Sequence, residues 1–498
     1  MKLWQLLAGV PLTGEPYSQD MEITSISYDT RTLLPGALFV ALPGAKTDGS
    51  LYIDEALAKG AAAVVCRRRP QREGVFFTTP DPRRALALLA ENWFGHPGRE
   101  MTLIGVTGTN GKTTTTFLIK EMLEGALKTQ VGLIGTIQNM VGERVLPAHR
   151  TTPESYEVQQ LLREMADSGC THVVMEVSSH ALVQHRVEGL DFSVAAFTNL
   201  TQDHLDYHHT MEEYRSAKER LFHQCRRAVL NLDDEAGRWY RERLACPVFT
   251  YSENKDQADL TAKGIRLYPG QVEFEAVARE QIQRVFLPIP GGFTIYNALC
   301  ALSVGLCLGL RLSECAAALR SARGVKGRVE VVPVPTAYTV LIDYAHSPNA
   351  LENILLTARD FTAGRLICLF GCGGDRDRTK RPIMGGVVKE LADLAVVTSD
   401  NPRTEDPEDI IRDILAGMEG EGAQIHVEPD RRQAIAWALS QGRPGDVIVL
   451  AGKGHETYQE IQGVQYPMDE REIVAQYFSS APSWGECPNE RYSDKIEL

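Results

Sequence analysis

Short apolar runs alternate with segments of helical spacing along most of the chain. In residues 1–98 the runs ITSISYD, ALFVAL, AAVVC and GVFFT predict four strands, with a helix from Asp54 to Lys59. Beyond residue 99 the runs THVVMEV, FSVAAFTNL and RAVLNL are short and rich in β-branched residues. Such runs are typical of parallel strands that are buried on both faces. Two helical segments, at 297–310 and 312–322, are predicted to end this region.

The pattern starts again near residue 331. Four apolar runs, TVLID, RLICLF, LAVVTS and VIVLAG, each lead into a polar cluster, respectively DYAHSP, GCGGDRDR, DNPRTEDP and GKGHE. Any one cluster is equally compatible with a solvated turn. Because ligands of open α/β sheets bind beyond the carboxyl ends of the strands, the four clusters together favour a binding site. We therefore predict an α/β protein of three domains, 1–98, 99–330 and 331–498, with a loosely held extension after about residue 478.

Composition narrows the class of protein. A length of 498 residues suits about three domains, and 43% hydrophobic residues are enough for large cores. The net charge of −13 argues against a protein that binds nucleic acid by neutralising phosphates. No apolar run approaches about 20 residues and the N-terminus does not resemble a secretory signal, so we expect a cytoplasmic protein without membrane insertion. The ten cysteines form no CxxC pair, which favours reduced core thiols over disulfides or a zinc site.

The segment MTLIGVTGTNGKTTTT, residues 101–116, carries the strongest chemical signal. An apolar strand leads through a glycine loop into a helix, the arrangement that binds nucleotide phosphates through backbone N–H groups. Lys112 supplies positive charge and the Thr113 hydroxyl can bind Mg²⁺. The spacing is a variant, because Val106 stands where a glycine is usual. A glycine turn alone would not explain a lysine followed by four threonines, so we expect ATP or a related nucleotide.

Further polar residues follow the next predicted strands. Glu176 lies in MEVSSHA and His204 in TNLTQDHLDYH, where the two could hold a divalent ion beside the phosphates. Mg²⁺ prefers oxygen ligands, so the histidine weakens this interpretation. On these residues alone, His204 and His208 are better explained as a surface pair one helical turn apart. Lys218 lies in an otherwise unremarkable helix.

Taken together, the motifs resemble those of a known family. TGTNGKTT, EVSSHAL, TNLTQDHLDYH, AKERLF, NALCA, GRVE, DYAHSP and GKGHE, in this order, are similar to the Mur ligases of peptidoglycan synthesis. The resemblance spans about residues 28 to 460. It implies an ATP-dependent, amide-forming ligase with a small N-terminal α/β uridine-binding domain, a central P-loop parallel-sheet ATPase domain and a C-terminal Rossmann-like domain. Within the family, the chain most resembles members that extend UDP-N-acetylmuramoyl-L-alanyl-D-glutamate by a third residue.

The resemblance implies an ATP site with two Mg²⁺ ions. ATP would contact Gly108, Thr109, Asn110, Gly111, Lys112, Thr113 and Thr114, with Asn297, Arg328, Asp343 and His346 on the adenine and ribose side. The metal ligands would be Thr113, Glu176, His204 and Lys218, the last as a carbamate. Carbamylation gives a lysine carboxylate-like oxygens, which explains its place at a metal. Lys112, Glu176, His204 and Lys218 would be the catalytic residues.

The same resemblance implies two more substrate sites. UDP-N-acetylmuramoyl-dipeptide would contact Tyr28, Thr30, Ala45, Lys46, Thr47, Thr151, Thr152, Ser178, Gln184 and Arg186. DNPR resembles the signature of ligases that select meso-diaminopimelate over lysine, and the implied contacts are Arg376, Asp400, Asn401, Pro402, Arg403, Gly452 and Glu456. Diaminopimelate differs from lysine by a carboxylate, which a guanidinium such as that of Arg403 binds bidentately. Arg376 would hold the other carboxylate, whereas Asp400 and Glu456 would hold an ammonium group.

Several alternatives stay open. A surface Pro-Arg turn would also explain DNPR, and Thr294 stands where family members often have asparagine. A folylpolyglutamate synthetase-like ligase or a lysine-adding ligase would share much of the same chemistry. A nucleic-acid-stimulated ATPase would share the loop, and an inactive relative would serve as a scaffold. We expect a monomer that activates a carboxylate as an acyl phosphate and closes around its substrates before the reaction.

Overall fold

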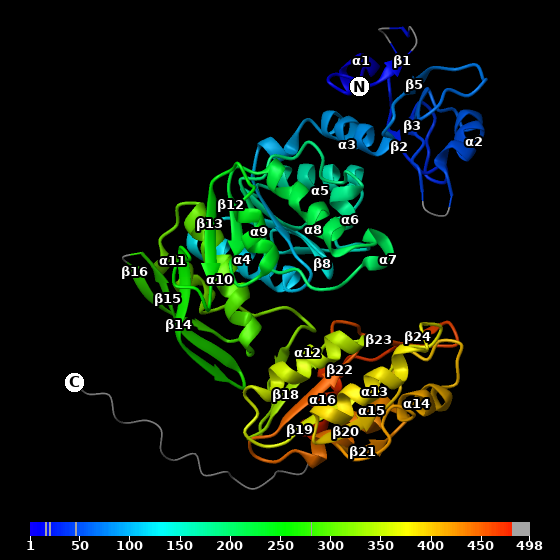
Figure 1. The fold of residues 1–498 in the computed structure, drawn as a ribbon. Helices are drawn as coiled ribbons and strands as arrows, with labels where there is room; N and C mark the ends of the chain where they lie inside the picture. The colour runs from blue at the N-terminus through cyan, green and yellow to red at the C-terminus, as the bar shows by residue number, and fades with distance from the viewer. Residues whose placement is uncertain (15–16, 19–20, 45–46, 280, 481–498) are drawn as a thin grey trace. The chain divides into compact units, whose positions relative to one another are not determined.

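The computed structural model describes residues 1–480 except 15–16, 19–20, 45–46 and 280 (Figure 1). It folds into two compact units. Among the described residues, the first comprises 1–266, 271–288 and 292–325, and the second comprises 267–270, 289–291 and 326–480. Each of the three large sheets falls, to within one residue, inside one predicted domain. The boundaries at residues 98 and 330 stay predictions.

The first sheet has the order β1-β5-β4-β3-β2, parallel except for β1. Successive residues of β3 face opposite sides: Leu38 and Val40 pack in one apolar cluster and Phe39 in another. The strands therefore have two buried faces, which explains their apolar character. The elements are α1 (Leu3–Leu6), β1 (Thr13–Gly14), β2 (Ile26–Ser27), β3 (Leu38–Val40), η1 (Gly49–Tyr52), α2 (Ile53–Ala58), β4 (Ala63–Cys66), β5 (Phe76–Thr78), α3 (Pro82–Trp93) and η2 (Pro97–Arg99).

The second sheet lies in the first unit except for the last two residues of β14, and it has the order β16-β15-β14-β13-β12-β11-β6-β10-β7-β8-β9. Its strands are β6 (Thr102–Thr107), β7 (Val131–Ile134), β8 (Gln138–Val141), β9 (Arg144–Pro147), β10 (His172–Glu176), β11 (Val194–Phe197), β12 (Ala228–Asn231), β13 (Val248–Ser252), β14 (Leu260–Tyr268), β15 (Gln271–Ala278) and β16 (Gln281–Leu287). Its helices are α4 (Lys112–Leu127), α5 (Ser155–Asp167), α6 (Ser179–Val183), α7 (Leu205–His208), α8 (Met211–Glu219), η3 (Arg220–Gln224), α9 (Glu235–Arg241), α10 (Gly292–Cys307) and α11 (Leu312–Leu319).

The middle of this sheet is parallel, as predicted, and antiparallel pairs extend it. β13, β12, β11, β6, β10 and β7 pair in parallel. β7–β8, β8–β9 and β15–β16 are antiparallel, and the apolar pattern did not predict these strands. In β8 and β15 buried residues alternate with more accessible ones, and β9 is mostly exposed, so these strands lack the continuous apolar runs of the middle strands. The parallel centre places several strand ends, with their loops, at one edge.

Helix α10 begins five residues before the predicted start at 297. It is buried around most of its circumference and packs against α4, which α11 also contacts. A helix that is apolar on all sides has to be covered on all sides. This packing brings Asn297 of α10 close to the glycine loop at the start of α4.

The second unit has a sheet of order β17-β18-β22-β19-β20-β21, parallel except for β17. The four predicted strands are confirmed as β18, β19, β20 and β22. Helices α12 and α13 pack together, as do α13 and α14 (Figure 1). The elements are β17 (Glu330–Val332), β18 (Thr339–Asp343), α12 (Pro348–Arg359), β19 (Leu366–Phe370), α13 (Lys380–Leu391), β20 (Leu394–Val397), α14 (Pro407–Leu415), β21 (Gln424–Val427), α15 (Arg431–Gln441), β22 (Val447–Ala451), β23 (Tyr458–Ile461), β24 (Val464–Pro467) and α16 (Glu470–Ser480).

Three further predictions concern the cysteines, membrane insertion and the C-terminal tail. The nine cysteines within the described residues carry free thiols, as expected, and Cys487 lies outside them. Within the same residues, no helix combines the length and apolar character needed to cross a membrane. Helix α16 continues to Ser480, past the predicted start of the tail, and residues 481–498 lie outside the description.

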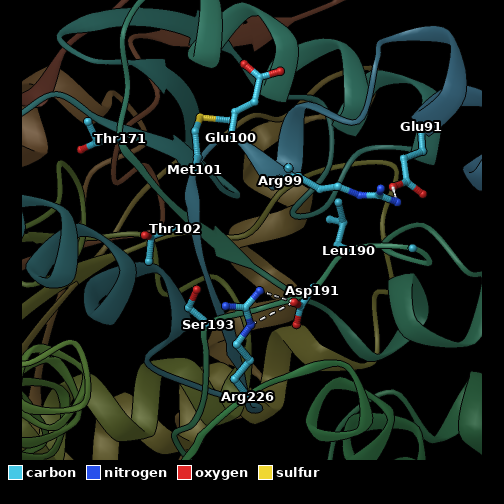
Figure 2. A pocket seen from close by; sticks show the side chains of 12 residues that line it. Glu91, Arg99, Glu100, Met101, Thr102, Thr171, Leu190, Asp191, Ser193 and Arg226 are labelled. Atoms are coloured by element: carbon cyan, nitrogen blue, oxygen red, sulfur yellow. Dashed lines mark hydrogen bonds and ion pairs between the residues drawn. The ribbon is translucent and has the colours of Figure 1, made fainter.

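A cavity of about 600 Å³ lies at the amino ends of β6 and β10 (Figure 2). Its lining includes Arg226 and Asp191, which form an ion pair, and Arg99, which pairs with Glu91. The glycine loop lies at the opposite ends of these parallel strands. This cavity therefore belongs to none of the predicted sites.

Candidate functional site

The glycine loop follows β6, between β10 and β11 in the sheet. Gly108 has a φ of +154°, and a Cβ there would lie 1.9 Å from Thr198 Oγ1. Gly111 has a φ of +80°, and its Cβ would lie 2.5 Å from Asn297 Oδ1. Both positions therefore need glycine, for the backbone conformation and for the close approach of a neighbour. The loop leads directly into the N-terminus of α4, where unpaired N–H groups favour an anion.

Two lysines meet at this loop. Lys112 Nζ donates to the carbonyl oxygens of Gly108, at 3.0 Å, and Thr109, at 2.8 Å. Lys218 Nζ, from α8, donates to the same Gly108 oxygen at 2.8 Å. Lys218 is 1% exposed, and its burial lowers its pKa well below the usual value. The nearby charge of Lys112 lowers this pKa further and Asp203 opposes the shift. The structure thus favours the neutral amine of Lys218.

Glu176 ends β10 as a fully buried carboxylate. Its Oε2 accepts from the hydroxyls of Thr113 and Thr136, each at 3.0 Å, and its Oε1 accepts from Thr136 N at 2.9 Å. Thr113 and Glu176 were both predicted metal ligands, and the fold brings them together. Their oxygen atoms suit the ligand preference of Mg²⁺. Thr136 was missed, because nothing in the sequence links GTIQN to the glycine loop.

The contacts described for His204 are with residues other than Thr113 and Glu176. It is exposed, its Nε2 lies 3.5 Å from Asp203 Oδ2, and its ring packs against His180 and Tyr214. Over the described part of the chain, no three His, Cys, Asp or Glu side chains form a metal-binding group. His208 is buried with its Nε2 2.8 Å from Ser179 Oγ, so the surface-pair interpretation of these two histidines is wrong for His208.

The remaining loop residues are held by the segment after β11. Thr109 N donates to Asn199 O at 2.8 Å, and Asn110 N donates to Asn199 Oδ1 at 2.9 Å. Asn297 accepts from the Thr115 hydroxyl at 3.2 Å, while its buried Nδ2 has no hydrogen-bond partner among the described residues. An unpaired buried donor beside a phosphate-type loop is free to bind a nucleotide.

The other predicted ATP residues lie in the second unit. Asp343, at the end of β18, accepts from Val329 N and Ala345 N, both at 2.8 Å. Burial raises the pKa of this carboxyl, against the charge of Arg328. The Arg328 guanidinium lies 5.3 Å from the centre of the Tyr344 ring, and His346 Nδ1 lies 2.8 Å from Tyr344 O. These residues form one polar group beyond β18.

The predicted dipeptide-site residues that lie in loops beside the second sheet form one cluster. The buried Thr152 hydroxyl donates to Glu176 O at 2.8 Å and accepts from Ser178 N at 3.1 Å. Arg186 donates to Thr152 O at 2.9 Å and to Gln184 Oε1 at 2.8 Å. The Thr151 hydroxyl accepts from Thr136. This cluster directly adjoins the Glu176 carboxylate.

The predicted residues near the N-terminus are less tightly grouped. Tyr28 donates to Glu157 Oε1 at 2.5 Å, Thr30 is buried, and Thr47 is exposed. Ala45 and Lys46 lie outside the described residues. Sequence reasoning missed the buried Glu154, which accepts from Arg83 Nη1 at 2.8 Å. Arg83 also donates to Pro43 O at 3.1 Å, so this pair joins the PGAKTDG segment to the residues beside Thr152.

In the second unit, the GCGG and DNPR segments pack together. Gly374 N donates to Asn401 O at 2.9 Å, and a Cβ at Gly374 would lie 1.9 Å from Pro402 O. Arg403 has a φ of +53°, and its side chain donates to Glu460 Oε2 at 3.0 Å and Gly374 O at 2.8 Å. Arg376 is exposed and contacts the backbone of Asp375. The fold therefore holds Arg403 in place and leaves Arg376 facing solvent.

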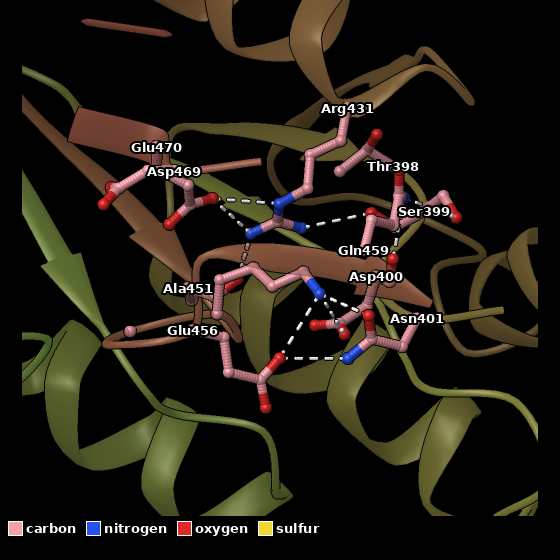
Figure 3. A network of polar contacts seen from close by, with 12 residues as sticks. Thr398, Ser399, Asp400, Asn401, Arg431, Ala451, Glu456, Gln459, Asp469 and Glu470 are labelled. Carbon is pink, nitrogen blue, oxygen red and sulfur yellow. Dashed lines mark hydrogen bonds and ion pairs between the residues drawn. The ribbon is translucent and has the colours of Figure 1, made fainter. Parts of the chain in front are cut away.

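Asp400, Asn401 and Glu456 meet around one buried lysine (Figure 3). Asn401 Nδ2 donates to Glu456 Oε2 at 3.0 Å. Lys453 Nζ donates to Asn401 Oδ1 and to Glu456 Oε2, and lies 3.7 Å from Asp400 Oδ1. A Cβ at Gly452 would lie 2.5 Å from Asp400 Oδ2, which explains the glycine. Lys453 was missed although it belongs to the quoted GKGHE motif.

Comparisons with known proteins follow the same three segments. The chain matches the family models described as "Mur ligase family, catalytic domain" over 22–91, "Mur ligase middle domain" over 106–305 and "Mur ligase, glutamate ligase domain" over 327–454. It is 45% identical over 486 residues to a UDP-N-acetylmuramoyl-L-alanyl-D-glutamate--2,6-diaminopimelate ligase of Caldanaerobacter subterraneus, covering 97% of this chain and 100% of the relative.

Solved structures extend this likeness to the fold. A structure of a UDP-N-acetylmuramoyl-L-alanyl-D-glutamate--2,6-diaminopimelate ligase matches with a TM-score of 0.73 and 32% identity, over 96% of this chain and 99% of that one. A folylpolyglutamate synthase of Mycobacterium tuberculosis, in complex with ADP and AMPPCP, matches with a TM-score of 0.58 and 19% identity, over 81% of this chain and 96% of that one. The second likeness concerns the fold alone.

Proposed function

The chain belongs to the Mur ligase family, and from this we propose that it joins meso-diaminopimelate to UDP-N-acetylmuramoyl-L-alanyl-D-glutamate at the expense of ATP. Relatives named UDP-N-acetylmuramoyl-L-alanyl-D-glutamate--2,6-diaminopimelate ligase match nearly the whole chain. The structural observation that carries the proposal is the meeting of the loops after β20 and β22, which gathers the carboxylates of Asp400 and Glu456 around Lys453 and holds the Arg403 guanidinium in the first of these loops. A guanidinium suits the extra carboxylate of diaminopimelate, and carboxylates suit its ammonium groups.

The reaction has two steps. An oxygen of the D-glutamate γ-carboxylate attacks the γ-phosphorus of ATP, the bond from that phosphorus to the bridging oxygen breaks, and ADP leaves. The neutral amine of diaminopimelate then attacks the carbonyl carbon of the acyl phosphate. The tetrahedral intermediate expels phosphate as the C–O bond breaks, and the nitrogen loses its proton. Phosphorylation is needed because a carboxylate is a poor acyl electrophile.

The protein binds and orients the reactants. The Gly108–Thr114 backbone and Lys112 would hold the phosphates and balance their negative charge. Lys112 folds back onto the loop, where its ammonium group would contact a bound phosphate. Thr113 and Glu176 would hold Mg²⁺, which supplies positive charge to the phosphate oxygens. Thr152, Ser178 and Arg186 would hold the peptide beside Glu176.

Lys218 is proposed to be carbamylated. Only a neutral amine attacks CO₂, and burial lowers the pKa of Lys218 toward that form. The amine nitrogen bonds to the carbon of CO₂ and releases one proton, leaving a carbamate with two oxygen atoms. The carbamate would replace the buried amine of Lys218 by two oxygen ligands for a second Mg²⁺. His204 would be a further ligand of this ion.

We place the enzyme, as a monomer, in the cytoplasm, where ATP and nucleotide-linked sugars are available. The direct test incubates the chain with UDP-N-acetylmuramoyl-L-alanyl-D-glutamate, ATP, Mg²⁺ and meso-diaminopimelate and follows phosphate release. Release that needs all three substrates supports the proposal. Turnover with lysine in place of diaminopimelate would contradict the amine specificity alone, and turnover with tetrahydrofolate and glutamate would favour a folylpolyglutamate synthetase-like function.

A further inference from the structure

Lys453 lies beneath the predicted amine site and is fully buried. Three of its contacts are predicted site residues: the carbonyl oxygen of the Asn401 side chain, Glu456 Oε2 at 3.3 Å and Asp400 Oδ1 at 3.7 Å. A fourth contact, to Tyr458 O at 2.8 Å, ties the ammonium group to the start of β23. The lysine thus joins the loop after β20 to the loop after β22.

The other charges near Lys453 are already paired. Arg431, fully buried, donates from Nε to Glu470 Oε1 at 2.9 Å and also to the carbonyl oxygens of Ser399 and Ala451 (Figure 3). The Arg403 guanidinium is paired with Glu460 at 3.0 Å. Lys453 is therefore the cation that directly accompanies Asp400 and Glu456 in the described cluster.

Counting charges shows what Lys453 does to the site. Two carboxylates with one ammonium group leave a net charge of −1, which matches one ammonium group of a bound diamino acid. Without Lys453 the two carboxylates would have no cation between them and would repel each other. Burial lowers the pKa of Lys453, while Asp400 and Glu456 raise it and so favour the charged form.

We propose that Lys453 is a positioning residue that fixes Asn401, Asp400 and Glu456 in the geometry that binds an ammonium group of the diamino-acid substrate. It acts through these side chains, because it is buried behind them. The inference rests on the proposed function, since it assigns the amine to this cluster. Specificity for a diamino acid would then depend on Lys453, although this lysine does not touch the substrate.

The test compares kinetic constants of wild type and Lys453→Met. The expected result is a KM for diaminopimelate raised about tenfold or more, the scale of a lost charged hydrogen bond. The KM values for ATP and the UDP-linked dipeptide should stay within about twofold, because their sites lie elsewhere. Lys453→Arg keeps the charge and should recover part of the loss. If Lys453→Met does not fold, Lys453→Gln replaces it with the same expected rise.

A matched control removes another buried lysine from the same unit. Lys389 is buried, and its Nζ donates to the backbone oxygens of Met418 and Gly420, away from the predicted site. Lys389→Met should lower the melting temperature yet leave the KM for diaminopimelate within about twofold. A folded Lys453→Met with an unchanged KM for diaminopimelate would overturn this inference alone. A wild-type chain without diaminopimelate-dependent phosphate release would overturn the proposed function, and the inference with it.

Discussion

At the scale of single residues, burial decides the chemistry of the lysines. Lys112 is partly exposed on a phosphate-type loop, where a charged ammonium group is useful. Lys218 donates to the same Gly108 oxygen from a fully buried position, and its lowered pKa favours the neutral amine. Two lysines that share one carbonyl oxygen thus differ in burial, which suits one to charge neutralisation and the other to carbamylation.

Replacing Lys218 should abolish the reaction while the chain stays folded. Lys218→Ala is expected to lower kcat about 100-fold or more, because the metal-binding carbamate proposed for this lysine would be lost. Short carboxylates such as formate should restore part of the activity by occupying the space of the carbamate. Phosphate release measured with and without formate checks this. Restoration by bicarbonate instead, or an unchanged kcat, would contradict the role. Lys120→Ala, which removes a buried lysine paired with Glu124, is the control.

Arg403 should distinguish diaminopimelate from lysine. Arg403→Ala is expected to weaken diaminopimelate binding by about 1.5–3 kcal/mol, the value of a charged hydrogen bond. The KM for lysine should change little, since lysine lacks the second carboxylate. Initial rates over a range of each amine measure both constants. Arg412→Ala, on the exposed face of α14, is the control. An unchanged KM for diaminopimelate would remove Arg403 from the site.

At the scale of elements, packing between helices sets properties that no motif shows. Helix α4 carries the phosphate-type loop at its start and contacts α10 and α11 along its length. Glu121, on α4, accepts from Arg323 N, just after α11, at 3.2 Å. Burial raises the pKa of Glu121 to about 7. The carboxyl group of Glu121 therefore titrates near neutral pH. It lies where α4, which carries the loop at its start, packs against α11 and the residues after it.

This contact should make stability depend on pH. The pKa of Glu121 is higher in the folded state than in the unfolded state, so its contribution is fully present below about pH 4.5 and is lost as the pH rises through about 7. The free energy of unfolding should fall by about 2 kcal/mol over this range, after allowance for solvent screening. Urea unfolding of wild type and Glu121→Gln at about pH 5 and about pH 8 tests this, with a smaller difference expected for the variant. An equal difference in both proteins would contradict the assignment.

At the scale of the whole molecule, the predicted ATP contacts are divided between two compact units. The glycine loop and Asn297 belong to the first, and Arg328, Asp343 and His346 belong to the second. Within the second unit, Asp343 fixes the backbone next to Arg328 through Val329 N. If one ATP contacts both groups, a change in the second unit has to alter ATP affinity although the phosphates bind to the first.

Arg328→Ala tests this division. The expected result is a KM for ATP raised about tenfold, the scale of a charged hydrogen bond, with the KM for diaminopimelate within about twofold. Initial rates with ATP varied at saturating concentrations of the other substrates measure the first constant. Lys326→Ala is the control, because that lysine is exposed and pairs with Asp469. An unchanged KM for ATP would show that Arg328 does not contact the nucleotide.

Much of the local structure could be predicted from the sequence. Apolar runs determined the parallel strands, because a strand with two buried faces has to be apolar throughout. The glycine loop was predictable because short-range backbone conformation and residue type determine it. The motifs that resemble a known family led to Thr113 and Glu176. In the structure the Thr113 hydroxyl oxygen lies 3.0 Å from Glu176 Oε2.

Tertiary structure alone decided which distant side chains meet. Thr136 contacts Glu176, Arg83 contacts Glu154, and Lys453 gathers Asp400, Asn401 and Glu456. These contacts join separate segments of the chain that only the packing of sheets and helices brings together. The antiparallel strands β15 and β16 escaped prediction, since exposed positions interrupt the continuous apolar run. Burial likewise lowers the pKa of Lys218 by desolvation, and desolvation exists only once the surrounding elements have packed.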